Sequence, residues 1–209
     1  MAKIRVLQFA GGQIHDWKAV GAEVNDVLKS SGKFTVNRVD EDLNVFTKDL
    51  SKYAAIVFHY TVGEITDAQM DGISSFVKGG RGFVGIHSAA DSFRGSPDFR
   101  AFIGGHFITH PRYRDYQVSV LDAQHPITEG LEEFIVTDEQ YITDYDPRNH
   151  VLATALYKGV AYPVAWTKKW GKGKVFYLAL GHDGPSAKHE KFRLMLERGT
   201  VWAATPDEK

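Results

Sequence analysis

The chain has 209 residues, of which 43% are hydrophobic and 24% are charged, and its formal net charge is -1. This composition is typical of one globular α/β domain with a sizeable core, and the near-neutral charge argues against a nucleic-acid or anionic membrane surface. The absence of cysteine excludes disulfides, iron–sulfur clusters, thiolate zinc sites and thiol nucleophiles.

Targeting signals are absent from the sequence pattern. No apolar run approaches the roughly 18 residues of a membrane-spanning helix. The N-terminal stretch "MAKIRVLQFAGG" has an apolar part that is too short for a signal peptide. We therefore predict a cytoplasmic protein that acts on a small molecule, with no nucleic acid and no membrane as partner.

Strand and helix patterns alternate through the first half of the chain. Short apolar runs predict buried strands, helical spacing of apolar residues predicts helices, and Thr66 with Gln69 predicts a capping box. The predicted elements are a strand at 4–10, a helix at 17–31, strands at 34–39 and 54–60, a helix between Thr66 and Gly79, and a strand at 82–86. This order is typical of a parallel sheet with helices on both faces.

The second half of the chain is less regular. Ser96 followed by Pro97 predicts a helix start. Strands are predicted at 116–121, 151–156, 162–167 and 174–180, and a terminal helix at about 188–203. Because no repeat or linker divides the chain, we predict a single domain over residues 1–209.

Histidines lie at or just past the ends of four of the predicted strands. In open α/β sheets, ligands bind at the carboxyl ends of the strands. The four strand ends lead to His15 with Trp17, to His59, to His87 with Ser88, and to His182 with Asp183. A single histidine after a strand is more often structural, so the prediction of a site depends on several of them meeting at one edge.

Two further histidines, His106 and His110, stand four residues apart in "GGHFITHP". On a helix this spacing places two imidazoles on one face, as in many zinc sites. The glycine pair before them and Pro111 after them oppose a helix. The pair is therefore an open candidate for binding a divalent metal such as Zn²⁺.

Carboxylates and tyrosines gather in "TDEQYITDY", residues 137–145. Carboxylates accept hydrogen bonds from sugar hydroxyls, and aromatic faces cover the C–H surfaces of sugars. Glu139 and Tyr141 are thus candidates for contact with a polyhydroxylated ligand. A solvated surface loop is the equally weighted alternative.

The chain resembles the ThuA-like, or trehalose-utilisation, family of the class I glutamine amidotransferase-like superfamily in five ordered segments, "GFVGIHSA", "GGHFITHP", "HPITEGLEEF", "TDEQY" and "WGKGKVFYLALGHD". With "HDW" at 15–17, the resemblance covers essentially the whole chain. It implies a flavodoxin-like three-layer α/β sandwich with a mostly parallel central sheet. It also implies a role in carbohydrate utilisation, on trehalose and related disaccharides through 3-keto intermediates.

The resemblance further implies a changed catalytic centre. In class I amidotransferases the sharp turn after a strand, the elbow, carries a cysteine nucleophile that a histidine from a later strand end activates. Here His87 stands at the elbow and His182 at the later position, so glutamine amide hydrolysis by that route is excluded. Ser88 is disfavoured as a nucleophile, because it follows the elbow residue and no base with an orienting partner is evident.

Two mechanisms are open. In the first, imidazoles and a carboxylate act as general acid and base on an oxidised sugar, which typically contributes about 10²–10⁴-fold. The reaction would be hydrolysis or elimination of the glycosidic oxygen, or an isomerisation. In the second, a divalent metal such as Zn²⁺ polarises the ketone or the hydroxyls. Its ligands would be several of His59, His87, His106, His110 and His182. The predicted catalytic residues are His87, His182, His106 and Glu139, the predicted metal pair is His106 and His110, and the predicted substrate-binding residues are His15, Trp17, His59, Ser88, Tyr141 and Asp183.

The alternative to an enzyme is a non-catalytic sugar-binding or accessory protein that keeps the elbow only as scaffold. A binding protein has little need for three or more histidines in one pocket, so their convergence would favour an enzyme. The apolar and aromatic segment "FIGGHFITHPRYRDY" suggests a homodimer contact.

Overall fold

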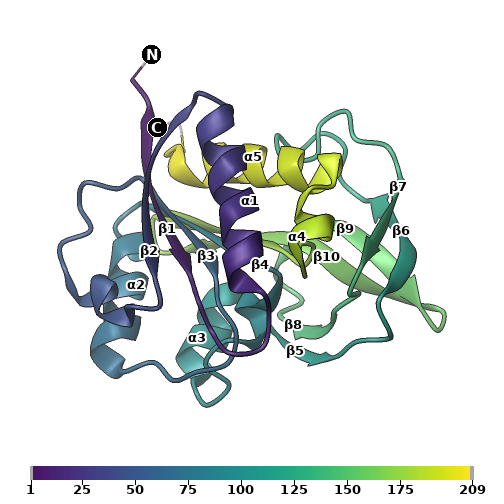
Figure 1. Cartoon of the computed structure of the whole chain (residues 1–209), viewed down its shortest axis with the longest axis horizontal. Coiled ribbons are helices and arrows are strands. Elements are labelled where there is room, and N and C mark those ends of the chain that lie inside the picture. Colours follow the sequence, from purple (N-terminus) through teal and green to yellow (C-terminus); the bar gives the residue numbers. More distant parts are fainter. Residues whose placement is uncertain (1, 208–209) are drawn as a thin grey trace.

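One large sheet crosses the computed structural model, which describes residues 2–207 (Figure 1). Within that range, nine strands lie in the order β2-β1-β3-β4-β11-β10-β9-β6-β7. They are β1 (Ile4–Ala10), β2 (Phe34–Asp40), β3 (Ala55–His59), β4 (Gly82–Ile86), β6 (Arg114–Val120), β7 (Phe134–Asp138), β9 (His150–Tyr157), β10 (Val160–Trp170) and β11 (Gly173–Leu178). Two short strands, β5 (Gly105–Thr109) and β8 (Ile142–Tyr145), pair with each other in a separate small sheet.

The large sheet has a parallel half and an antiparallel half. Strands β2, β1, β3, β4 and β11 pair in parallel, and β10, β9, β6 and β7 continue the sheet in antiparallel pairs. The parallel half and its covering helices confirm the flavodoxin-like α/β fold. The sequence patterns do not predict β5, β7 or β8, because alternation over four or five residues is a weak signal.

Helices cover both faces of the sheet and complete three layers (Figure 1). One face carries α1 (Trp17–Ser30), α4 (Gly184–Ala187) and α5 (Glu190–Ala204), and the other carries α2 (Asp67–Lys78) and α3 (Pro97–Ile103). Two 3-10 turns, η1 (Leu43–Thr47) and η2 (His87–Asp91), lie on the second face. Among residues 2–207, no helix has both the length and the apolar content to cross a bilayer.

Local signals in the sequence set the helix starts. The Thr66 hydroxyl accepts from the Gln69 amide, and the Gln69 side chain accepts from the Thr66 amide at 2.9 Å, which confirms the predicted capping box. Pro97 is the first residue of α3, as predicted. The predicted terminal helix begins later than expected, because the His189 side chain caps α5 and the short helix α4 precedes it.

The strand order brings several loops to one edge. Strand β1 lies between β2 and β3, and the chain leaves β1 toward one face and β3 toward the other. Because β1, β3, β4 and β11 are parallel, their carboxyl ends share an edge, which is where ligands bind in open α/β sheets.

Candidate functional site

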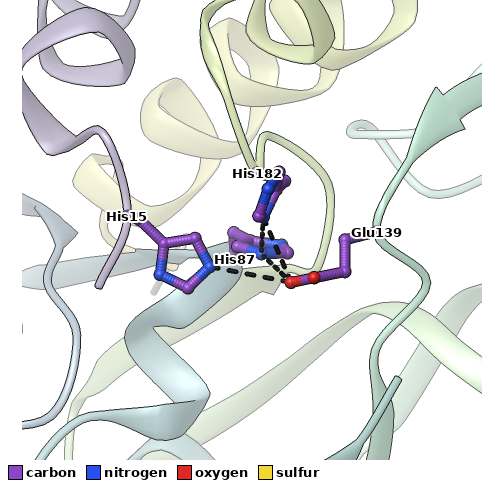
Figure 2. A group of neighbouring side chains, drawn as sticks. All are labelled: His15, His87, Glu139 and His182. Carbon is purple, nitrogen blue, oxygen red and sulfur yellow. Dashed lines mark hydrogen bonds and ion pairs between the residues drawn. The ribbon is translucent and has the colours of Figure 1, made fainter. Parts of the chain in front are cut away.

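Three histidines and one glutamate meet at this edge, and we call them the central group: His15, His87, Glu139 and His182 (Figure 2). His15 lies in the loop between β1 and α1, His87 is the residue after β4, and His182 follows β11. One donor atom from each member lies within 4.8 Å of all the others. In the described part of the chain, no other group of three or more histidine, aspartate or glutamate side chains brings its donor atoms this close together. The predicted convergence of strand-end histidines is therefore observed for three of the four strands.

Glu139 is the hub of the central group. Its Oε2 lies 3.1 Å from His182 Nδ1, 3.4 Å from His87 Nε2 and 3.6 Å from His15 Nε2. Figure 2 draws these contacts as dashed lines. Its other oxygen, Oε1, lies 3.0 Å from His110 Nδ1. Burial opposes ionisation, but the surrounding imidazoles outweigh it and hold the pKa of Glu139 well below its usual range. The carboxylate is therefore ionised at neutral pH.

His87 occupies the elbow in a strained backbone conformation. Its φ is +42°, in the left-handed region that a β-carbon disfavours, and its side chain is fully buried. Its Nδ1 donates to the Ala179 carbonyl at 2.7 Å, and the Tyr177 hydroxyl donates to the His87 carbonyl at 2.7 Å. Burial lowers the pKa of His87 to about 4, so the ring is neutral at pH 7. Since Nδ1 carries the proton, Nε2 presents a lone pair to the central group.

His182 is the most solvent-accessible member of the central group, with 28% of its side chain exposed. Its Nδ1 also lies 3.3 Å from His87 Nε2. Burial opposes protonation, but the hydrogen bond to Glu139 and the charge of that carboxylate raise the pKa of His182. Of the three imidazoles, His182 therefore has the best access to a proton from solvent or substrate.

Asp138 holds the His182 loop against the end of β7. This buried carboxylate accepts from the Gly181 amide at 2.7 Å, the His182 amide at 3.2 Å and the Glu139 amide at 2.7 Å. Burial raises its pKa to about 6. The sequence places Asp138 in the carboxylate-rich stretch at 137–145, but its role in holding the His182 loop was not predicted.

His59 and Ser88 lie behind the central group. The Ser88 hydroxyl is 3.5 Å from His59 Nε2, and the His59 ring is 6.4 Å from the His15 ring. Both side chains are buried, and burial lowers the pKa of His59 well below its usual value. The contact with substrate that the sequence predicts for His59 and Ser88 stays a prediction. The histidine that the Ser88 hydroxyl contacts is His59.

Tyr141 packs directly on the elbow histidine. Its ring lies 4.0 Å from the His87 ring and 4.5 Å from the Phe107 ring, and it is almost completely buried. The loop at 139–141 is therefore a packed wall of the site, and the alternative of a solvated surface loop is wrong for Glu139 and Tyr141.

Trp17 and Asp183 lie outside the central group. Trp17 is the first residue of α1, half-buried, with the Lys18 ammonium 5.4 Å from its ring. Asp183 caps α4 by accepting from the Ser186 amide at 2.7 Å, and lies 3.4 Å from the Tyr113 hydroxyl. Neither belongs to the central group, so their predicted contact with substrate stays a prediction.

His106 and His110 are separated by the structure. Residues 105–109 form strand β5, so the helical spacing considered for a metal pair is not observed. His106 Nδ1 lies 3.8 Å from Asp144, whereas His110 Nδ1 lies 3.0 Å from Glu139. The catalytic role predicted for His106 has no support from this geometry, and His110 is the one of the pair that borders the central group.

A cavity of about 310 Å³ lies between η2, α3 and β5. His106 and Phe107 line it, and none of the central group does. Phe107 contacts Tyr141, which in turn contacts His87, so one aromatic layer separates this cavity from the elbow.

These features define an α/β protein of flavodoxin-like fold in which a histidine stands at the sharp turn after β4. Residues 5–203 match the model of the ThuA family, described as trehalose utilisation. The chain belongs to this family and is a trehalose-utilisation-associated protein. The resemblance noted in the sequence is confirmed.

Solved structures of similar fold support the same architecture. A protein described as ThuA-like from Parabacteroides merdae aligns with a TM-score of 0.87 and 23% identity, over 100% of this chain and 93% of its own. A second ThuA-like protein, from Bacteroides uniformis, aligns with a TM-score of 0.79 and 20% identity, over 96% and 91%. A β-galactosidase from Rahnella sp. R3 aligns with a TM-score of 0.66 and 17% identity, over 93% of this chain and 31% of its own. A comparison with curated proteins gives no match.

Proposed function

We propose that this protein is an enzyme that acts on trehalose-type disaccharides, in particular on a disaccharide oxidised to a 3-keto sugar. The observation that carries the proposal is the convergence of three imidazoles on one buried carboxylate at the ligand-binding edge of the sheet. The family description supports the substrate class. A sugar-binding or accessory protein would not need this concentration of titratable groups.

The proposed reaction is an elimination. A 3-keto group acidifies the C–H bond at C2, so a base removes that proton and the electron pair forms a C1=C2 double bond. The C1–O bond breaks, and the departing oxygen takes up a proton, giving a free sugar and an unsaturated keto sugar. Proton transfer by positioned side chains typically contributes about 10²–10⁴-fold to such a step.

Two imidazoles are suited to carry the proton. His182 and His110 both contact Glu139, and 28% and 40% of their side chains are exposed. His87 is buried and neutral, so we assign it to holding the site rather than to exchanging protons with solvent. His106 lines the neighbouring cavity, and we assign it to contact with the substrate rather than to chemistry.

The test is a turnover assay with 3-keto-trehalose and plain trehalose, with products identified by mass spectrometry. We expect turnover of the keto sugar alone. We expect His182→Ala to lower it by about 10²-fold or more, while His150→Ala, which changes an exposed histidine paired with Asp122, leaves it unchanged. Absence of turnover of both sugars by folded protein would overturn the proposal in favour of a binding protein.

Location and assembly remain predictions from the sequence. The proposed cytoplasmic location suits a chain without cysteine. The proposed homodimer contact includes Ile108 and Tyr113, which are exposed large hydrophobic residues.

A further inference from the structure

The lone pairs of the central group point at one another. The Ala179 carbonyl can only accept, so His87 Nδ1 carries a proton and Nε2 is the nitrogen left to bind a cation. That Nε2 faces Glu139 Oε2 at 3.4 Å. Two lone pairs at this distance repel each other unless a proton or a metal cation lies between them. His182 Nδ1, 3.1 Å from Oε2 and 3.3 Å from His87 Nε2, brings a third donor atom to the same point.

The spacing of these donor atoms matches the coordination shell of a small cation. Zinc–ligand distances of about 2.0–2.1 Å in a tetrahedral site place neighbouring donors about 3.4 Å apart. The four separations around Glu139 Oε2 and His87 Nε2 are 3.1, 3.3, 3.4 and 3.6 Å. One ion can therefore contact Glu139, His87 and His182 together, and His15, whose donor atom lies within 4.8 Å of the other three, is the fourth candidate ligand.

Outer contacts fix the ligands as they do in metal proteins. The His15 Nδ1 bonds with the Thr61 hydroxyl at 2.8 Å, which turns Nε2 toward the group. The His87 Nδ1 is fixed by the Ala179 carbonyl, and Glu139 Oε1 is occupied by His110 at 3.0 Å. Such partners orient imidazole and carboxylate ligands and tune their basicity.

We propose that the central group binds one divalent transition-metal ion, with zinc as the ion that fits best. Imidazole nitrogens with a carboxylate oxygen suit zinc, iron or nickel, whereas magnesium and calcium prefer all-oxygen sites. The site differs from the pair predicted from sequence spacing, because His106 is not a ligand and His110 is an outer partner. Metal binding stands independently, while its part in turnover rests on the proposed function.

A bound metal would give the ligands and His110 different functions in the reaction. The ion would polarise the sugar ketone and stabilise the negative charge that develops on its oxygen. His182 would then be a ligand, and proton transfer would fall to His110. We therefore expect His110→Ala to lose turnover while it retains the metal.

The test is calorimetric titration of EDTA-treated, dialysed protein with Zn²⁺ alone. We expect one ion per chain. His87→Ala, His182→Ala and Glu139→Gln should each lower the affinity by about 100-fold or more, and His106→Ala should not change it. Circular dichroism confirms that each variant is folded, and Co²⁺ in place of Zn²⁺ reports the ligand set through its visible absorption.

Two outcomes would overturn the metal proposal. One is the absence of stoichiometric binding by folded wild-type protein, and the other is equal loss of binding in His106→Ala. The assay also separates this proposal from the proposed function. Bound metal without turnover of either sugar would refute the function alone, and full turnover by metal-free protein that binds no Zn²⁺ would refute the metal centre alone.

Discussion

At the scale of single residues, the elbow is defined by the backbone of His87. A φ of +42° for a residue with a β-carbon costs about 1–3 kcal/mol, and it persists because the surroundings determine it. Here the surroundings are the hydrogen bonds of its ring to Ala179 and of its carbonyl to Tyr177, with Tyr141 packed on the ring. The strain positions Nε2 at the centre of the site.

This strain is measurable by comparing two substitutions. Both His87→Gly and His87→Ala remove the imidazole, but glycine adopts positive φ without a steric penalty. We expect the free energy of unfolding of the glycine variant to exceed that of the alanine variant by about 1 kcal/mol. Urea denaturation of chelator-treated protein measures both. Equal stabilities would show that the elbow relaxes once the ring is gone.

Individual residues differ in how far the sequence predicts them. The histidines after β1, β4 and β11 were predictable, because a histidine in the first few residues after a short apolar strand lies near the carboxyl edge of the sheet. The family resemblance and the carboxylate-rich loop predicted Glu139 as a site residue, but not its contact with all three imidazoles of the central group. That contact depends on the course of β7, which lies at the far end of the sheet order from the elbow strand β4. No local pattern encodes such a contact.

At the scale of elements, Asp138 joins two strands that are not neighbours. Its carboxylate at the end of β7 accepts three backbone amides, two of them from the Gly181–His182 turn after β11. A buried amide that loses its partner costs about 1–3 kcal/mol. The turn and the end of β7 are thus held together by one side chain.

Removal of this carboxylate should affect stability and turnover together. We expect Asp138→Ala to lower the free energy of unfolding by about 3 kcal/mol and to lower turnover, since the amides at 181 and 182 lose their acceptor. Asp115→Ala, at an exposed position of β6, is the matched control and should cost less than about 1 kcal/mol. Denaturant titration of both variants checks this, and similar costs for the two would contradict it.

The turn after β6 gives a pH dependence of stability. His125 Nδ1 accepts from the Ile127 amide at 3.2 Å, and burial, with the nearby His150, lowers the His125 pKa below its ordinary value of 6.5. The unfolded chain therefore binds more protons between the two pKa values. The stability that neutral His125 contributes is therefore fully present above about pH 6.5 and is lost as the pH falls through the pKa of His125 in the folded protein.

The variant His125→Gln should flatten this dependence. We expect the wild-type protein to lose more stability than the variant between about pH 7.5 and pH 5, as followed by urea unfolding. A loss of equal size in both proteins would assign the acid sensitivity to other groups.

At the scale of the whole molecule, the fold divides into a part that local patterns determine and a part that they do not. Capping residues, helical spacing and buried apolar runs predict the parallel half, because each βαβ unit carries its own signals. In the antiparallel half most strands pair with their neighbours along the chain, but the short strand β7 carries no strong pattern and the pairing of β6 with β9 joins segments that are distant in sequence. The site lies where the two halves meet, so its complete membership could not be deduced from either half alone.

The two halves of the fold supply different parts of the site. The parallel half supplies the edge with its histidines, and the antiparallel half supplies the carboxylate that gathers them. Proteins of one fold commonly differ in function through such residues at strand ends and in loops rather than through the core.

The most direct test of the account is the rate of 3-keto-trehalose turnover by Glu139→Gln, compared with wild type and with Glu132→Gln, which changes an exposed carboxylate outside the site. Glutamine keeps the size of the side chain but removes the charge on which the imidazoles converge. The account predicts a fall of about 10²-fold or more for Glu139→Gln and no change for Glu132→Gln. Wild-type turnover by folded Glu139→Gln protein would contradict the assignment of the central group as the active site.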